Sequence, residues 1–242
     1  MDRPRDSQRS TQRAKDRPKA ATDDPKTAYL ILYNFFSATL WFSILLLTVT
    51  TTTSLGPQYL YPYLGDLVKW TQTLAALEIA HSLSGLVRSP VLTTVMQVAS
   101  RFLLVWGVVD RFPQVAQDER FGGCYAYAGM LAAWSVTEVV RYGYFAMALG
   151  WGVEKVPGVV KWARYNGFWV LYPLGIGSEC FLIYLAATGP ARFINIGGVR
   201  VSWGLWVVLG VYVPGSYILF THMMAQRQKI LKGDGGKVKK MK

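Results

Sequence analysis

Cysteine and histidine are scarce in this chain of 242 residues, which contains two of each. Cys124 and Cys180 are too few for a disulfide framework and lack the spacing of a zinc site. Neither is followed by an arginine six positions later, so the Cys-x5-Arg loop of cysteine phosphatases is absent. His81 follows Glu78 at the spacing of di-iron helices, but a membrane desaturase or hydroxylase needs many more histidines. We therefore expect no metal site.

Charge is scarce in the body of the chain and concentrated at its two ends. Residues 1–27 hold eight Lys/Arg and five Asp, and residues 222–242 hold seven Lys/Arg and one Asp. The net charge is +12, yet 52% of the residues are hydrophobic and the mean hydropathy is +0.22, which is high for a soluble protein. A basic fringe beside apolar segments is typical of a membrane protein rather than a nucleic-acid-binding one. We expect no nucleic-acid partner.

Apolar segments of about 20 residues, each long enough to cross a bilayer, predict an all-α polytopic membrane protein. A disordered basic arm is expected over residues 1–27, a transmembrane domain over residues 28–222, and a basic tail over residues 223–242. Polar loops are expected between the spans, including an interfacial, tyrosine-rich loop over residues 50–65. The six expected spans are residues 28–49, 67–87, 91–109, 125–149, 167–188 and 203–221.

The distribution of Lys and Arg predicts the topology of the six-helix bundle. If both termini are cytosolic, the cytosolic segments hold nineteen of these residues and the opposite side holds five. This asymmetry agrees with the positive-inside rule. Lys239 and Lys240 lie fourth and third from the end of the chain, as in the dilysine retrieval signal of endoplasmic reticulum membrane proteins. We expect endoplasmic reticulum retrieval; the alternative is a generic basic tail.

Five Glu and Arg side chains fall within the expected spans, around the midplane and in the cytosolic half: Glu78, Arg101, Glu138, Arg141 and Glu179. Such groups are costly in hydrocarbon unless paired, so they mark a functional site. Glu138 and Arg141 are three residues apart and can form a local ion pair, and Arg101 is expected to pair with Glu78. Two roles are equally compatible with these pairs: holding the helices of the bundle together, and contacting the substrate. Three acids and two arginines leave one acid available for proton transfer.

The segment Tyr172-Pro-Leu-Gly-Ile-Gly-Ser-Glu179 lies inside the expected span over residues 167–188. Seven residues, about two helical turns, separate its Tyr and Glu, which places both on one helix face. Pro173, Gly175 and Gly177 lie between them, weaken the helix and let a ligand approach the backbone. A tyrosine hydroxyl and a desolvated glutamate are competent acid–base groups, and no nucleophile–His pair accompanies them. The segment therefore indicates elimination or isomerisation rather than acyl transfer.

Two runs together resemble a known family. The run Trp134-Ser-Val-Thr-Glu-Val-Val-Arg-Tyr142 is followed by Arg164-Tyr-Asn-Gly-Phe-Trp-Val-Leu-Tyr-Pro-Leu-Gly-Ile-Gly-Ser-Glu179. They are similar to the very-long-chain 3-hydroxyacyl-CoA dehydratases, also called protein-tyrosine-phosphatase-like membrane proteins. The resemblance covers residues 28 to about 222 and includes the complete Tyr-Pro-x-Gly-x-x-Ser-Glu motif. In that family the Tyr and Glu of the motif are the catalytic pair, which implies catalytic roles for Tyr172 and Glu179.

The resemblance also implies a reaction and a setting. The reaction is the third step of fatty-acid elongation, in which a very-long-chain (3R)-3-hydroxyacyl-CoA loses water to give the trans-2-enoyl-CoA. One of Tyr172 and Glu179 takes the C2 proton and the other helps the 3-hydroxyl leave; Glu179 is favoured on the hydroxyl side, and the reverse stays open. Six spans in the endoplasmic reticulum membrane with cytosolic termini are implied, and no cofactor is expected beyond the CoA carried by the substrate.

The implied partners are the bilayer and the other elongation enzymes, namely elongase, ketoacyl-CoA reductase and enoyl-CoA reductase. The alternative is a non-catalytic scaffold of the same fold that binds elongation enzymes. A transporter is disfavoured because the two halves of the chain show no internal repeat. The supporting or substrate-orienting positions are Glu78, Arg101, Glu138, Arg141, Gly175 and Ser178. The basic positions expected at the rim, where CoA phosphates would lie, are Arg88, Lys155, Lys161 and Arg164.

Overall fold

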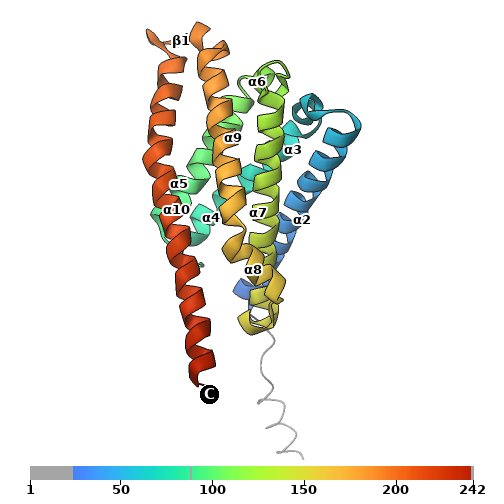
Figure 1. The fold of residues 1–242 in the computed structure, drawn as a ribbon, viewed down its shortest axis with the longest axis vertical. Coiled ribbons are helices and arrows are strands. Elements are labelled where there is room, and N and C mark those ends of the chain that lie inside the picture. Colours follow the sequence, from blue (N-terminus) through green and yellow to red (C-terminus); the bar gives the residue numbers. More distant parts are fainter. Residues whose placement is uncertain (1–23, 88, 241–242) are drawn as a thin grey trace, which may run out of the picture.

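A computed structural model describes residues 24–87 and 89–240, with side chains up to residue 228, and this part of the chain is almost entirely helical (Figure 1). The helices are α2 (Pro25–Ser54), η2 (Pro57–Tyr59), α3 (Leu60–Leu74), α4 (Ala76–Leu83), α5 (Val91–Phe102), η3 (Leu103–Val109), α6 (Pro113–Gln117), α7 (Gly123–Trp151), η4 (Val153–Lys155), α8 (Gly158–Asn166), α9 (Phe168–Thr188), η5 (Pro190–Phe193) and α10 (Val201–Lys240). A short hairpin of β1 (Asn195–Ile196) and β2 (Val199–Arg200) precedes α10.

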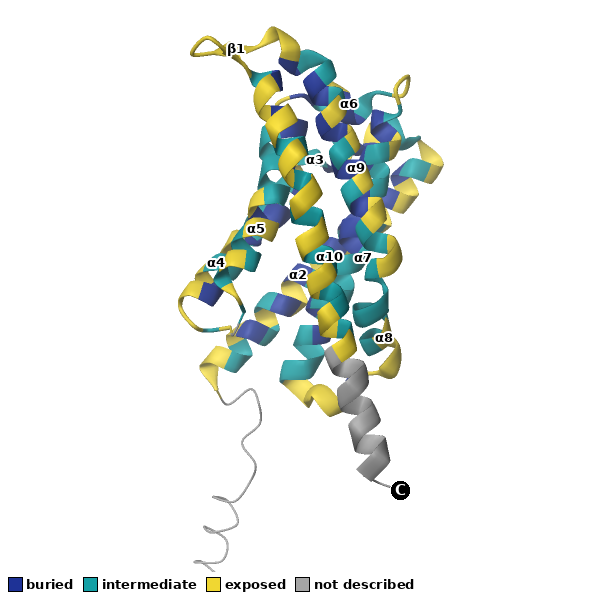
Figure 2. Ribbon diagram, turned by 60° about the vertical axis from the view of Figure 1, so that its left-hand side comes forward, coloured by how far each residue is buried: buried dark blue, intermediate teal, exposed yellow. Residues whose placement is uncertain are grey.

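Helix α7 lies in the middle of the bundle and packs mainly against α2 and α9, while α10 packs against α9 (Figure 1). Large apolar side chains such as Trp41, Met130 and Leu182 are fully buried where α2, α7 and α9 meet. Most of α10 remains exposed along its outer side (Figure 2). The start of α2, the end of α10 and helix α8 lie at one end of the bundle, here called the terminal end. The β1–β2 hairpin and α6 lie at the opposite end.

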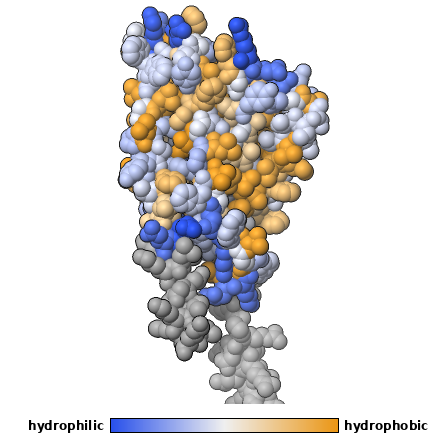
Figure 3. Space-filling model, in the orientation of Figure 1, coloured by the Kyte–Doolittle hydropathy of each residue, from blue (hydrophilic) through white to orange (hydrophobic). Residues whose placement is uncertain are grey.

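Four helical segments are long and apolar enough to cross a membrane. Figure 3 shows apolar residues over the middle of one face, with hydrophilic residues gathered toward both ends. A lipid-facing belt has this appearance, because polar and charged side chains are costly in hydrocarbon. The remaining expected spans, residues 67–87 and 125–149, correspond to α3–α4 and α7, and their crossing of a membrane stays a prediction. The four segments are Pro25–Ser54, Val91–Val109, Phe168–Phe193 and Val201–Gln228.

The interfacial loop expected over residues 50–65 is wrong, because this region is mostly helical. Threonine hydroxyls at the end of α2 bond to carbonyls one turn earlier, with Thr50 Oγ1 3.0 Å from the Leu46 oxygen and Thr53 Oγ1 2.9 Å from the Val49 oxygen. The Thr50 and Thr53 hydroxyls are therefore satisfied within the helix, whereas the buried Thr52 hydroxyl has no partner among the described residues. Pro62 lies in the first turn of α3, where a missing N–H breaks no helical hydrogen bond.

The start of the first span also differs from the expected boundary at residue 28. Asp24 caps α2: its Oδ1 accepts a hydrogen bond from the Lys26 N–H at 3.4 Å and its Oδ2 accepts one from Thr27 Oγ1 at 2.8 Å, so the helix begins at Pro25. Residues 1–23, which make up most of the expected disordered arm, lie outside the described residues.

The second and third expected spans are irregular helices. Helix α3 gives way to α4 at Ala75, and α5 continues into η3, a π-helix. The wider turn is visible in the bond of 3.0 Å from the Asp110 N–H to the Val105 oxygen, five residues earlier. Arg101 lies in the last turn of α5, directly before this π-helix. π-Helical turns occur frequently at functional sites.

Gly123, at the start of α7, is held tightly against α6. A Cβ at this position would lie 1.9 Å from the Val115 carbonyl oxygen, which is backbone and cannot rotate away. We expect Gly123→Ala to lower the free energy of unfolding by about 1–3 kcal/mol, as overpacking does. Thermal unfolding of the purified protein in detergent measures this effect.

Gly143 provides the matched control on the same helix. Apart from its chain neighbours and the backbone of its own helix, no atom lies within 4 Å of a Cβ added there, so Gly143→Ala is expected to raise stability by about 0.5–1 kcal/mol. Equal Tm shifts for the two variants would contradict the close approach of α6 and α7.

Candidate active site

Two arginines and two glutamates from three helices form one ion-pair cluster. Arg101 Nη1 from α5 donates to Glu138 Oε1 on α7. Arg141, also on α7, donates from Nε to Glu138 Oε2 at 2.7 Å, and its Nη2 lies 2.6 Å from the same oxygen in an ion pair. The same guanidinium binds the Glu78 carboxylate of α4 through Nη1 at 2.9 Å and Nη2 at 2.7 Å. Tyr142 donates a further hydrogen bond to Glu78.

This cluster tests the pairing expected from the sequence. The Glu138–Arg141 pair is confirmed, whereas the Arg101–Glu78 pair is wrong: Arg101 binds Glu138, and Glu78 binds Arg141. Glu78 pairs with Arg141 rather than Arg101 because the contact with Arg141 is bidentate, a geometry in which a planar guanidinium matches a carboxylate. Two positive and two negative charges balance within the cluster.

Glu179 lies apart from these pairs. Its carboxyl is buried, with 7% of the residue exposed, and no Lys, Arg or His of the described residues lies within ion-pair distance. Its two oxygens instead accept hydrogen bonds from neutral donors, Trp134 Nε1 at 2.8 Å on Oε1 and Tyr212 Oη at 3.0 Å on Oε2. Glu179 is therefore the unpaired acid that the count of three glutamates and two arginines predicted.

Trp134 connects the ion-pair cluster to Glu179. Its N–H binds the Glu179 carboxyl, and the Arg101 guanidinium carbon lies 4.9 Å from the centre of its ring, within range of a cation–π contact. Arg141 uses Nε, Nη1 and Nη2 on carboxylates, whereas Arg101 binds a described side chain through Nη1 alone. Arg101 thus keeps donors that a ligand could use next to Trp134 and Glu179.

Tyr172 lies two turns before Glu179 on α9 and also contacts α10. Its hydroxyl donates to the Ser216 carbonyl oxygen at 2.8 Å, and its ring centre lies 5.9 Å from that of Phe220. Helix α9 continues through Pro173, so the expected weakening produces no break. The Tyr172 hydroxyl donates its proton in the hydrogen bond to Ser216, so its oxygen still has a lone pair that can accept a hydrogen bond from a substrate group.

Gly175 and Ser178 lie where α9 meets α7. A Cβ on Gly175 would be 3.6 Å from the Ala133 Cβ and 4.0 Å from Glu179 Oε1, which places this glycine beside the carboxyl. Ser178 is buried, and a Cβ on Gly129 would lie 2.9 Å from its Oγ. Small residues on both helices allow this close approach, as is common between membrane helices.

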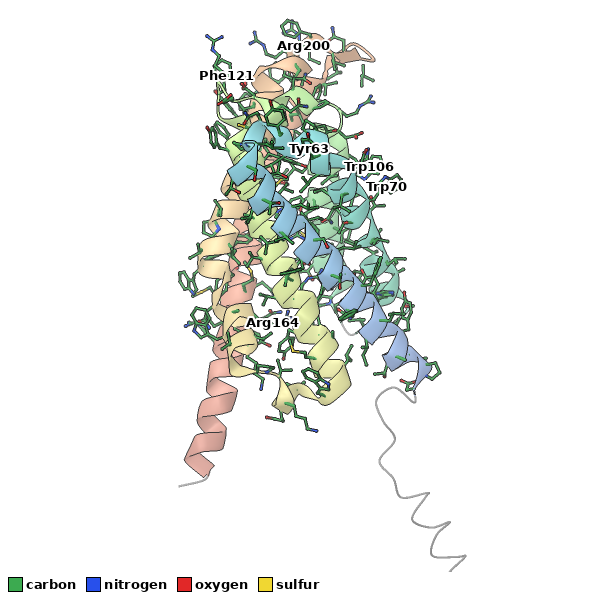
Figure 4. The ribbon with its side chains drawn as sticks, turned by 90° about the vertical axis from the view of Figure 1, so that its right-hand side faces the viewer. Tyr63, Trp70, Trp106, Phe121, Arg164 and Arg200 are labelled. Atoms are coloured by element: carbon green, nitrogen blue, oxygen red, sulfur yellow. The ribbon has the colours of Figure 1, made fainter. Side chains whose placement is uncertain are left out.

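The basic residues expected at the rim are in different environments. Lys155 is exposed on η4 and Lys161 is half-buried on α8, at the terminal end. Arg164, labelled in Figure 4, packs its guanidinium on aromatic rings, the nearest being Phe145 at 4.4 Å, and its buried Nε has no partner in the described residues. Burial lowers the pKa of Arg164 from its ordinary value. Arg88 lies outside the described residues.

His81 belongs to a polar layer near the start of α2. It is buried, and its Nε2 lies 2.9 Å from the Tyr29 hydroxyl, so it is a satisfied core histidine. No group of three or more His, Cys, Asp or Glu side chains that could hold a metal occurs in the part of the chain that the structure describes.

Three residues of the site were not predicted: Trp134, Tyr142 and Tyr212. Trp134 and Tyr142 begin and end one of the runs that carry the family resemblance, so a signal was present for them. Tyr212 lies in a span with several other aromatic residues and had no distinguishing pattern. The dilysine residues Lys239 and Lys240 lie beyond residue 228, outside the described side chains.

Comparisons with known proteins agree on one family. The model of "Protein tyrosine phosphatase-like protein, PTPLA" matches residues 72–233. A Schizosaccharomyces pombe protein named "Probable very-long-chain (3R)-3-hydroxyacyl-CoA dehydratase" is 42% identical over 217 residues, covering 86% of this chain and 94% of its own. The Arabidopsis thaliana dehydratase PASTICCINO 2 is 36% identical over 217 residues, covering 85% of this chain and 94% of its own.

A mouse protein named "Very-long-chain (3R)-3-hydroxyacyl-CoA dehydratase 1" is 31% identical over 219 residues, covering 86% of this chain and 74% of its own. No solved structure matches the chain. The resemblance inferred from the Tyr-Pro-x-Gly-x-x-Ser-Glu motif is thus confirmed, and the chain belongs to the protein tyrosine phosphatase-like (PTPLA) family.

Proposed function

We propose that the protein is a hydro-lyase that dehydrates very-long-chain (3R)-3-hydroxyacyl-CoA to the trans-2-enoyl-CoA, the third step of fatty-acid elongation. The observation that carries the proposal is the buried Glu179 carboxyl: among the described residues its partners are neutral donors, whereas Glu78 and Glu138 are ion-paired. A carboxyl in this setting can both hold and release a proton. The names of the relatives in yeast, plant and mouse supply the substrate class.

Elimination divides the work between two groups. A base removes a proton from C2, the C2–C3 double bond forms, and an acid protonates the 3-hydroxyl as the C3–O bond breaks and water leaves. We assign Glu179, in its protonated form, to the hydroxyl side and Tyr172, acting as the phenolate, to C2. Tyr172 gains the C2 proton and Glu179 gives its proton to the departing water; release of the new Tyr172 proton and uptake of one by Glu179, by way of solvent, restore the pair. The free donors of Arg101 are suited to the thioester carbonyl, where negative charge develops as C2 is deprotonated. Arg141, with its donors committed to two carboxylates, is assigned to holding the cluster together.

The substrate would contact two regions of the bundle, one with its acyl tail and the other with its CoA phosphates. The acyl tail would lie along apolar helix surfaces, where burial contributes about 0.8 kcal/mol per CH₂. The CoA phosphates would lie at the terminal end, near Lys155, Lys161 and Arg164, and Arg88 is a fourth candidate. Arg164 has no carboxylate of the described residues within ion-pair distance, which leaves its charge available to an anion.

The setting proposed for the enzyme is the endoplasmic reticulum membrane, with six spans and both termini cytosolic. The described start of α2 and end of α10 lie at the same end of the bundle, which supports an even number of crossings (Figure 1). Lys239 and Lys240 would act as the retrieval signal. Elongase, ketoacyl-CoA reductase and enoyl-CoA reductase are the proposed partners, since they would catalyse the other steps of the cycle: the first reductase makes the substrate and the second consumes the product.

The proposal is tested in membranes from a host that lacks its own dehydratase. Membranes that contain this protein should convert a long-chain (3R)-3-hydroxyacyl-CoA to the trans-2-enoyl-CoA. Chromatography of the CoA esters measures the conversion. Well-folded protein that forms no product would favour the alternative function, a scaffold of the same fold that binds elongation enzymes.

Hydrogen exchange at C2 tests the division of roles. If Glu179 acts on the hydroxyl, Glu179→Gln should still exchange the C2 hydrogen with solvent although it no longer forms product. Incubation of substrate in D₂O followed by mass spectrometry measures this exchange. Loss of both exchange and product formation in this variant would support the reverse assignment, with Glu179 at C2.

A further inference from the structure

Helix α10 contributes one polar group to each of the two proposed catalytic residues. Among the described residues, two hydrogen bonds involving side chains join α9 to α10: Tyr212 Oη to Glu179 Oε2 at 3.0 Å, and Tyr172 Oη to the Ser216 oxygen at 2.8 Å. Both involve a proposed catalytic residue. Tyr212 and Ser216 are four residues apart, about one helical turn, so a single face of α10 meets both groups.

Packing alone does not account for Tyr212. The neighbouring side chains of α10 face outward, with Val211 60% and Val213 72% exposed, whereas the Tyr212 hydroxyl points inward to a buried carboxyl. An apolar residue would fill this contact without a hydroxyl to satisfy. A hydroxyl, by contrast, can donate to a carboxylate and accept from a carboxylic acid, so it can follow both protonation states of Glu179.

We propose that Tyr212 is a positioning residue for dehydration: its hydroxyl fixes the orientation of the Glu179 carboxyl, with Trp134 holding the other oxygen. This inference rests on the proposed function. Because Ser216 on the same face of α10 binds Tyr172, α10 also sets where the Tyr172 hydroxyl lies relative to that carboxyl. Displacement of a reacting group by about 1 Å can lower a rate 10²-fold.

Tyr212→Phe removes one oxygen atom and tests the proposal in purified protein. We expect kcat to fall about 10- to 100-fold with KM changed less than about 2-fold, because the contact orients a reacting group and does not bind substrate. Tyr217→Phe on the same helix is the matched control, since Tyr217 is 71% exposed, and its kcat should equal that of the wild type. Trp134→Phe, which removes the donor on the other oxygen, should show the same loss in kcat.

Two results would overturn the inference. A Tyr212→Phe enzyme with kcat within about 3-fold of wild type, or one with raised KM and unchanged kcat, would assign Tyr212 to packing or substrate binding. If Tyr212→Phe proves poorly folded, the Trp134→Phe measurement decides in its place, because an unchanged kcat there would show that orientation of Glu179 is not rate-determining. An inactive wild type would instead refute the proposed function, so the two failures are distinguishable.

Discussion

Glu138→Ala is expected to lower the free energy of unfolding by about 3–5 kcal/mol, the usual cost of removing one partner of a buried ion pair. Glu138 is 2% exposed and receives hydrogen bonds from both Arg101 and Arg141. Arg141 would keep Glu78, but Arg101 would lose its carboxylate; of its contacts with the described side chains, the one with the face of the Trp134 ring would remain. An unpaired charged side chain within the hydrocarbon of a bilayer is costly, which adds to the expected loss of stability.

Asp66 supplies the control for this prediction. It forms an ion pair of 3.0 Å with Lys69, but its side chain is 87% exposed, and exposed pairs contribute about 0–1 kcal/mol. Thermal unfolding of Glu138→Ala and Asp66→Ala in the same detergent should therefore give very different Tm values. Similar, small shifts in both variants would mean that the cluster does not stabilise the bundle.

Glu179→Gln and Tyr172→Phe are each expected to lower kcat about 10²–10⁴-fold, the range for loss of a general acid or base. Both substitutions keep the shape of the side chain and remove its proton chemistry. The binding regions for CoA and the acyl tail are untouched, so KM should change little. Steady-state kinetics at matched amounts of folded protein measure both parameters.

Tyr184→Phe is the matched control for Tyr172→Phe, because Tyr184 lies on the same helix and is 43% exposed. Its kcat should equal that of the wild type. A comparable loss in Tyr184→Phe would indicate that α9 tolerates no change, and would remove the argument that Tyr172 has a special role.

The sequence predicted much of this architecture because its signals are local. Apolar runs located the helices that can span a membrane, and the spacing of Glu138 and Arg141 predicted their ion pair. Charge counting among the five intramembrane residues also predicted that one acid would stay unpaired. These inferences depend only on helix periodicity and on the cost of charge in hydrocarbon, which hold before any packing is known.

The partners across helices could not be predicted. Which acid Arg101 binds depends on how α5 turns relative to α7, and the π-helix that follows Arg101 departs from ideal periodicity. Tyr212 faces Glu179 because of the way α10 is rotated about its axis where it packs on α9, and residues 201–221 of α10 are largely apolar on all sides, so the sequence does not indicate which side faces inward. Similarly, Pro57, Pro62 and three tyrosines suggested a loop over residues 50–65, although α2 continues to Ser54 and the Thr50 and Thr53 hydroxyls bond to carbonyls of the same helix.

The most direct test of the central claim is the rate of trans-2-enoyl-CoA formation from a long-chain (3R)-3-hydroxyacyl-CoA by purified protein in lipid nanodiscs. Wild type, Tyr172→Phe and Glu179→Gln would be compared at equal folded concentration. We predict steady formation of product by the wild type and a loss of about 10²–10⁴-fold in each variant. Wild-type activity that survives both substitutions would contradict the assignment and move the reacting groups to the cluster of Glu78, Arg101, Glu138 and Arg141.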